Sequence, residues 1–212
     1  MRKTGSLRER LGNDELDLSS GVHKYVDGMT RRSKVRIGPG SYFVSYGEGE
    51  ILTTVLGSCI SVCAGDPETG VGGMNHFMLP MPTVSDGPPN TVDLRTGAHA
   101  MEALLNDILR HGCPRSRIKL KIFGGADMIG TAHPVGATNI EFALDYFKRE
   151  GMPIEATDIG GTDARKLEYE PRSGRARVKL IVDHSAQKLR SEEERYQKQL
   201  SNVVVTNDVE LF

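Results

Sequence analysis

Short apolar runs separated by glycine and proline dominate the chain from residue 34 to residue 79. Each run has the alternating or continuous apolar pattern of a β-strand, and the residues between the runs are typical of turns. The strands predicted in this way cover residues 35–37, 42–44, 51–56, 59–63 and 71–79. Gly57 separates two of these strands, so we expect a sharp turn directly before Cys59.

Two segments further along have the apolar spacing of amphipathic helices. The first covers residues 98–109 and ends at Gly112, and the second covers residues 140–147 and ends at Gly151. Asn139 stands where the N-cap of the second helix is expected. The proline-rich segment 81–94 before the first helix predicts a surface loop long enough to border a site.

The remaining strands are predicted at residues 118–123, 154–159, 165–170 and 175–182. The last two are joined by a hairpin at 171–174. The chain thus has about eight strands and two main helices, and their order does not alternate as a doubly wound parallel sheet requires. We therefore expect an α/β fold, a layered sandwich with mixed sheets.

Both ends of the chain differ in composition from the part between them. Residues 1–32 are charged and lack apolar periodicity, which predicts a flexible N-terminal arm. Residues 33–184 form the predicted domain, and 185–212 form a charged C-terminal tail. Within that tail, Leu189, Tyr196 and Leu200 give a thin apolar stripe after a candidate cap at Ser185, which predicts a marginal, exposed helix over 188–198.

Composition narrows the class of protein. The 212 residues carry 27 Lys and Arg against 28 Asp and Glu, a net charge of −1, so we expect no nucleic-acid partner. No apolar run reaches the roughly 18 residues that cross a bilayer, and the start of the chain lacks an apolar signal core. Three cysteines in no framework spacing favour reduced thiols. The sequence therefore predicts a cytoplasmic protein without membrane insertion.

Cys59 and His76 are the residue pair best placed for chemistry. A catalytic thiol needs a neighbouring imidazole and backbone N–H groups that can hold an oxyanion, and a turn at Gly57-Ser58 can supply those groups. The two residues lie near the ends of neighbouring predicted strands, so they can meet across a sheet. From the residues alone, packed core groups are the commoner outcome for such a Cys and His. Thr53 is likewise either an ordinary strand residue or a partner for an imidazole N–H.

A metal site is the alternative interpretation of the same region. Cys59, Cys63 and His76 could supply three ligands, but no fourth ligand or second close-spaced pair follows. Gly124-Gly125 follows a strand without the remainder of a phosphate-binding motif. We therefore expect neither a metal nor a cofactor.

Several motifs surround these candidate residues. They are LGSCISV at 56–62, GMNHFMLP at 73–80, KIFGGA at 121–126, GATNI at 136–140, DIGG at 158–161 and Arg165-Lys166. In these motifs the chain closely resembles the CheD family of chemoreceptor glutamine deamidases, over residues 34–182. The resemblance implies a cysteine hydrolase whose Cys-His-Thr site corresponds to Cys59, His76 and Thr53.

The resemblance also implies the reaction and the partners. The expected enzyme is a protein-glutamine glutaminase, an amide hydrolase with a cysteine nucleophile, which converts glutamines of methyl-accepting chemotaxis receptors into glutamates. It implies that receptor methyl esters can be hydrolysed at the same site, and that a CheC-type phosphatase can be a partner. Two alternatives stay open: a non-catalytic adaptor that regulates such a phosphatase, and transfer of the acyl group to an amine.

Overall fold

The computed structural model describes residues 21–46, 49–79, 91–128, 135–181 and 185–201. Within these ranges the chain forms ten strands and three α-helices, together with a short 3₁₀ helix at Arg115–Arg117. The strands are β1 (Val22–Val26), β2 (Ser33–Ile37), β3 (Ser41–Tyr46), β4 (Ile51–Leu56), β5 (Ile60–Asp66), β6 (Val71–His76), β7 (Lys119–Gly124), β8 (Ile154–Ile159), β9 (Ala164–Glu170) and β10 (Arg175–Ile181). The helices are α2 (Thr91–Arg110), α3 (Val135–Arg149) and α4 (Ser185–Ser201).

The strands form two five-stranded mixed sheets. One has the order β1-β2-β4-β9-β10 and the other the order β3-β6-β5-β7-β8. The pairs β2–β4 and β7–β8 are parallel, and the other pairs of neighbouring strands are antiparallel. The predicted mixed-sheet α/β sandwich is confirmed, with ten described strands where the sequence indicated about eight.

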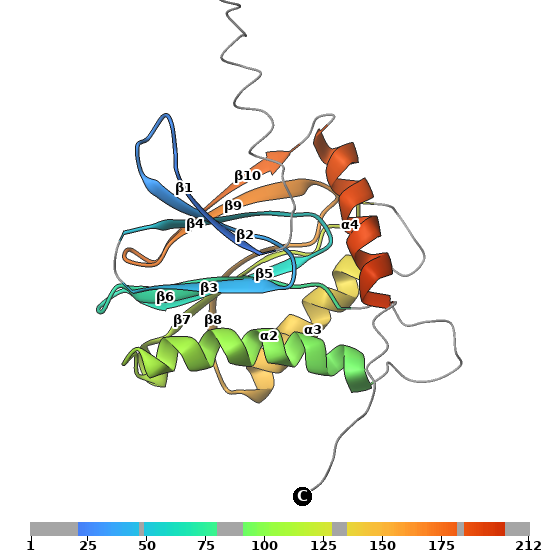
Figure 1. Ribbon diagram of the computed structural model, residues 1–212. Helices are drawn as coiled ribbons and strands as arrows, with labels where there is room; N and C mark the ends of the chain where they lie inside the picture. The colour runs from blue at the N-terminus through green and yellow to red at the C-terminus, as the bar shows by residue number, and fades with distance from the viewer. Residues whose placement is uncertain (1–20, 47–48, 80–90, 129–134, 182–184, 202–212) are drawn as a thin grey trace, which may run out of the picture.

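The elements stack in three layers, which Figure 1 shows from the side. The β1-β2-β4-β9-β10 sheet packs on one face of the β3-β6-β5-β7-β8 sheet, and α2 and α3 cover the other face of that second sheet. The helix-side core holds the largest group of buried side chains, including Phe77, Leu104 and Phe147. The core between the sheets holds Leu52, Leu56 and Met74. Helix α4 lies apart from the other two, at one end of the sheets.

Alternation along β5 sorts its side chains between these two cores. Val62 and Ala64 pack in the helix-side core, whereas Cys63 packs between the sheets together with Cys59, which directly precedes the strand. The candidate thiol therefore faces the other sheet and not the helices. Any partner that reaches it comes from β6, from β4 or from the end of the sandwich.

The N-terminal boundary predicted at residue 33 needs correction. Residues 22–26 form β1, which pairs antiparallel with β2 from Val22 opposite Ile37 to Val26 opposite Ser33. The strand is at the edge of its sheet and all five residues are exposed. Because an exposed edge strand needs no apolar face, its sequence lacks the periodicity that marks the inner strands. The first twenty residues of the predicted arm lie outside the described residues.

The beginning of α3 also differs from the prediction. The helix starts at Val135, four residues before Asn139, so Asn139 belongs to the helix body and is not its N-cap. Its side chain is fully buried and makes two hydrogen bonds, one to the turn before β5 and one to the segment after β6. Most of the predicted loop 81–94 lies outside the described residues, and α2 begins at Thr91.

Candidate active site

The turn between β4 and β5 presents three peptide N–H groups on one side. Its three carbonyls are all held on the other side: Ala126 N–H donates to Gly57 O at 2.7 Å, and Gly125 N–H donates to Cys59 O at 2.8 Å. The carbonyl of Ser58 accepts a hydrogen bond of 2.8 Å from the side-chain amide of Asn139. With each carbonyl held in this way, the N–H groups of the turn are oriented together.

The carboxylate of Glu193, on α4, lies in front of these N–H groups. Gly57 N–H donates to Oε1 at 2.9 Å and Ser58 N–H donates to Oε2 at 2.9 Å, while the Ser58 hydroxyl also donates to Oε2 at 2.8 Å. Cys59 N–H reaches Oε1 at 3.5 Å. The turn thus already binds a carboxylate with the donors that an oxyanion requires.

His76 lies on the same face as Cys59, on the neighbouring strand. The Ile60–Phe77 bridge and the Cys63–Met74 pair share one antiparallel register, which places Cys59 diagonally across from His76. Diagonal neighbours in a sheet are about 7–8 Å apart, within reach of side chains on one face. Both residues are buried, with 0% and 1% of their surface exposed. The structure therefore brings the predicted thiol and imidazole to one place.

The predicted partner of the imidazole is wrong by one position. The hydroxyl of Thr53 donates to Leu167 O at 3.0 Å, within its own sheet. Thr54 Oγ1 instead lies 2.8 Å from His76 Nδ1. Neighbouring residues of a strand point to opposite faces, and on β4 it is the Thr54 side that faces β6. The residue that orients the imidazole is thus Thr54, and Thr53 is a buried strand residue.

The hydrogen bonds around Thr54 determine the tautomer of His76. The Thr54 hydroxyl has one proton, and it donates that proton to Ile37 O at 2.7 Å. Its oxygen must then accept from His76, so Nδ1 carries the imidazole proton and Nε2 carries the lone pair. Among the described residues Nε2 has no hydrogen-bond partner, although it is buried. His76 is therefore held in the tautomer that a general base requires.

Burial keeps both groups of the pair neutral. Desolvation lowers the pKa of His76 to about 4. Burial also raises the pKa of the Cys59 thiol well above its usual value, and the Glu193 carboxylate beside it raises that pKa further. The covered site therefore holds a thiol and a neutral imidazole. Cys59 can ionise to a thiolate only when the Glu193 carboxylate moves away from it or when the surroundings of the sulfur become more polar.

Besides Thr54, the sequence does not indicate that Glu193 contributes to this site. Glu193 belongs to α4, for which the sequence predicts an exposed helix in a charged tail. In the structure, Leu189 on the same helix is 1% exposed and Glu193 is 7% exposed. The signal that identifies Glu193 is its position, four residues after Leu189 and three before Tyr196, in the middle of the apolar stripe.

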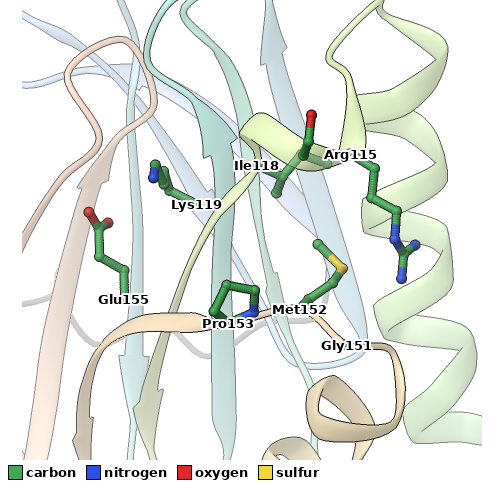
Figure 2. Close-up of a pocket in the computed structure, with 8 residues that line it drawn as sticks. Arg115, Ile118, Lys119, Gly151, Met152, Pro153 and Glu155 are labelled. Atoms are coloured by element: carbon green, nitrogen blue, oxygen red, sulfur yellow. The ribbon is translucent and has the colours of Figure 1, made fainter.

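The other candidates lie apart from this arrangement. No cluster of three metal-ligating side chains occurs in the part of the chain that the structure describes, so Cys59, Cys63 and His76 do not converge as a metal site. A surface hollow of about 590 Å³ lies between the start of β7 and the segment after α3 (Figure 2). It is lined by Arg115, Ser116, Ile118, Lys119, Gly151, Met152, Pro153 and Glu155. Lys119 pairs with Gly65, at the far end of β5 from Cys59, so this hollow is not the thiol site.

A buried thiol, a tautomer-fixed imidazole and a cradle of backbone donors are the parts of a thiol-dependent acyl hydrolase. The family model described as CheD chemotactic sensory transduction matches residues 78–180. A relative from Hydrogenovibrio crunogenus is 43% identical over 90% of this chain and all of its own length. Relatives from Caulobacter vibrioides and Vibrio cholerae are each 42% identical, over 88% and 90% of this chain and 97% and 84% of their own lengths. The chain belongs to the CheD family.

These relatives share one name, "Probable chemoreceptor glutamine deamidase CheD". A solved Neisseria meningitidis protein of the DUF152 family model is 12% identical and covers 57% of this chain with a TM-score of 0.34, a likeness too small to support an argument. No helix in the described part of the chain is long and apolar enough to cross a membrane.

Proposed function

We propose that this protein is a chemoreceptor glutamine deamidase that uses Cys59 as its nucleophile and His76 as its base. The observation that carries the proposal is the backbone cradle at Gly57–Cys59, which binds a glutamate side chain through its carboxylate directly beside the thiol. Glutamate is the product of glutamine hydrolysis. The names of the relatives supply the class of substrate, a chemoreceptor.

The first half of the reaction forms a thioester. His76 Nε2 accepts the proton of the Cys59 thiol, and the sulfur attacks the side-chain carbonyl carbon of the substrate glutamine. The N–H groups of the turn stabilise the negative charge that develops on the carbonyl oxygen. His76 then donates its proton to the leaving nitrogen, and ammonia departs as the carbon–nitrogen bond breaks.

The second half hydrolyses that thioester. Water takes the place of ammonia, His76 Nε2 accepts a proton from it, and the resulting hydroxide attacks the thioester carbon. The carbon–sulfur bond breaks, the thiol recovers its proton, and a glutamate side chain is released. A receptor methyl ester follows the same course with methanol as the leaving group, so the proposal includes methylesterase activity.

Thr54 and Asn139 are positioning residues in this scheme. Thr54 holds the Nδ1 proton of His76 and keeps Nε2 available as a base. Asn139 joins the carbonyl of Ser58 to Leu79 N–H, three residues past His76, at 2.8 and 2.9 Å. It therefore couples the turn that carries the nucleophile to the segment that carries the base.

The free state of all three cysteines, Cys59, Cys63 and Cys113, supports a reducing compartment. We accordingly place the reaction in the cytoplasm. A CheC-type partner stays a prediction of the family resemblance.

The decisive experiment is product analysis on the full chain. Purified protein is incubated with the cytoplasmic fragment of a chemoreceptor, and we measure ammonia together with glutamine-to-glutamate mass shifts in receptor peptides. We expect both in the wild type and neither in Cys59→Ala. Added primary amine separates hydrolysis from amine transfer, because only transfer adds the mass of the amine. Equal ammonia release by Cys59→Ala and wild type would overturn the proposal.

A further inference from the structure

One face of α4 is built around the active site. Leu189, Glu193, Tyr196 and Leu200 are spaced at intervals of four, three and four residues, so they share one side of the helix. Leu189 packs with Val55, Ala126, Met128 and Ala164. Tyr196 and Leu200 pack on the core between the sheets, the cluster that contains Cys59. Glu193 lies between these two apolar anchors.

The fit of Glu193 in the turn is close. A Cβ atom added to Gly57 would lie 2.2 Å from Met128 Sδ and 2.6 Å from Glu193 Oε2, so a side chain at this position would force the carboxylate to shift. Tyr196 makes a similarly close approach to the turn before β3, where a Cβ on Gly40 would lie 2.7 Å from its hydroxyl. Figure 1 shows α4 across the end of both sheets. The helix thus covers the face from which a substrate would approach Cys59.

Chemically, Glu193 occupies the position of a reaction product. Both of its oxygens accept hydrogen bonds from the turn, as a product carboxylate would. The same carboxylate is reached by the backbone N–H of Cys59 at 3.5 Å and raises the pKa of the Cys59 thiol, so the sulfur and the carboxylate are neighbours. A glutamine side chain has the same length and shape as glutamate without the negative charge, so in this place it would present its carbonyl carbon to the sulfur.

We propose that α4 is an intramolecular occupant of the substrate site, with Glu193 in the place of the product glutamate. This inference rests on the proposed function for the identity of the product. The site is closed while α4 is bound, and a substrate must displace the helix. The partner that fits the uncovered surface is itself an amphipathic helix, with a glutamine inside its apolar stripe, a leucine-like residue four positions before it and an aromatic residue three positions after it.

The first test converts the occupant into a substrate. In full-length Glu193→Gln, we expect Cys59 to attack the introduced glutamine and water to return it to glutamate with release of ammonia. Peptide mass spectrometry should find glutamate at position 193 in this variant, and glutamine there when Glu193→Gln is combined with Cys59→Ala. Glu194→Gln, at the neighbouring exposed position, is the matched control and should keep its glutamine. A glutamine that persists at position 193 in a preparation able to deamidate receptor would overturn the proposal.

The second test measures how strongly α4 shields Cys59, and it requires no catalytic turnover. Iodoacetamide labels Cys59 in the full chain, and the labelled peptide is quantified over time. We expect Glu193→Ala and Leu189→Ala each to raise the labelling rate by about tenfold or more, because both weaken the closed state, while Glu194→Gln keeps the wild-type rate. Leu189→Ala keeps the Glu193 carboxylate. Faster labelling of this variant therefore reports greater exposure of Cys59 and not removal of the acidic side chain that raises the pKa of the thiol.

The outcomes of the two tests separate the cover from the proposed function. Wild-type labelling rates in both Glu193→Ala and Leu189→Ala would overturn the cover. Faster labelling of these variants in a protein that does not deamidate receptor would leave the cover standing and reject the proposed function.

Discussion

Thr54 and His76 join the two sheets at the candidate site. The Oγ1–Nδ1 distance is 2.8 Å, and Thr54 belongs to β4 of one sheet whereas His76 ends β6 of the other. The imidazole is therefore oriented from across the sandwich core and not by its own sheet.

Thr54→Ala should lower the single-turnover rate of receptor deamidation by about tenfold to a hundredfold, since the imidazole loses the partner that fixes its tautomer. Thr54→Ser keeps the hydroxyl and should retain most of the rate. Thr53→Ala is the matched control. It loses a hydrogen bond to Leu167 O, which costs about 1 kcal/mol of stability, but its rate should stay near that of the wild type. Equal losses in Thr53→Ala and Thr54→Ala would argue against this assignment.

Cys59 should be the one thiol that turnover requires. Cys59→Ala should release no ammonia above the uncatalysed background, because neither of the other two thiols lies at the backbone cradle. Cys63→Ala should keep most of the rate and lose about 1 kcal/mol of unfolding free energy, since it removes only a buried sulfur from the core between the sheets. Ammonia release and urea unfolding, measured on the same preparations, check the predictions for both cysteine variants. Loss of turnover in a folded Cys63→Ala would contradict the prediction.

Gly57→Ala should disrupt binding in the cradle. The added Cβ would fall 2.2 Å from Met128 Sδ and 2.6 Å from Glu193 Oε2, so both side chains must shift and the cradle becomes narrower. We expect receptor deamidation to fall by at least about a hundredfold, comparable to the loss of an oxyanion donor. Cys59 labelling should rise because α4 can no longer seat Glu193. Normal turnover in this variant would show that the substrate carbonyl binds elsewhere.

The buried neutral state of His76 should make stability depend on pH. Its pKa is about 4 in the folded protein and near 6.5 when unfolded, so between these values the unfolded chain binds more protons. Stability is therefore full above about pH 6.5 and falls as the pH drops toward 4, by about 3 kcal/mol at most for this residue.

Urea unfolding between pH 7 and pH 4 measures this effect. The decline should be shallower in His76→Asn than in the wild type, because the variant lacks the buried imidazole. Identical slopes in the two proteins would show that His76 is not held neutral by burial.

The sequence predicts the inner strands well because their apolar runs and glycine turns are local features. It does not distinguish Thr53 from Thr54, because all six residues of β4 are buried and a strand covered on both faces has no polar side to set its orientation. Only the packing of β4 against β6 decides which threonine meets His76. Glu193 escapes prediction for a related reason: a charge on a charged helix is ordinarily solvated, and only the turn after β4 provides donors to bury it.

The connection between β10 and α4 has a kinetic consequence. β10 ends at Ile181 and α4 begins at Ser185, so three residues lie between α4 and the sheet that contains β10. The same sheet contains β4, which leads into the turn of the site. A competitor on so short a tether has a local concentration of order millimolar, which dilution of the enzyme does not change. Substrate helices must therefore displace the closed state, and the ratio of closed to open protein multiplies their apparent dissociation constant. The concentration of receptor helix that gives half-maximal turnover is thus set in part by the chain's own C-terminal helix.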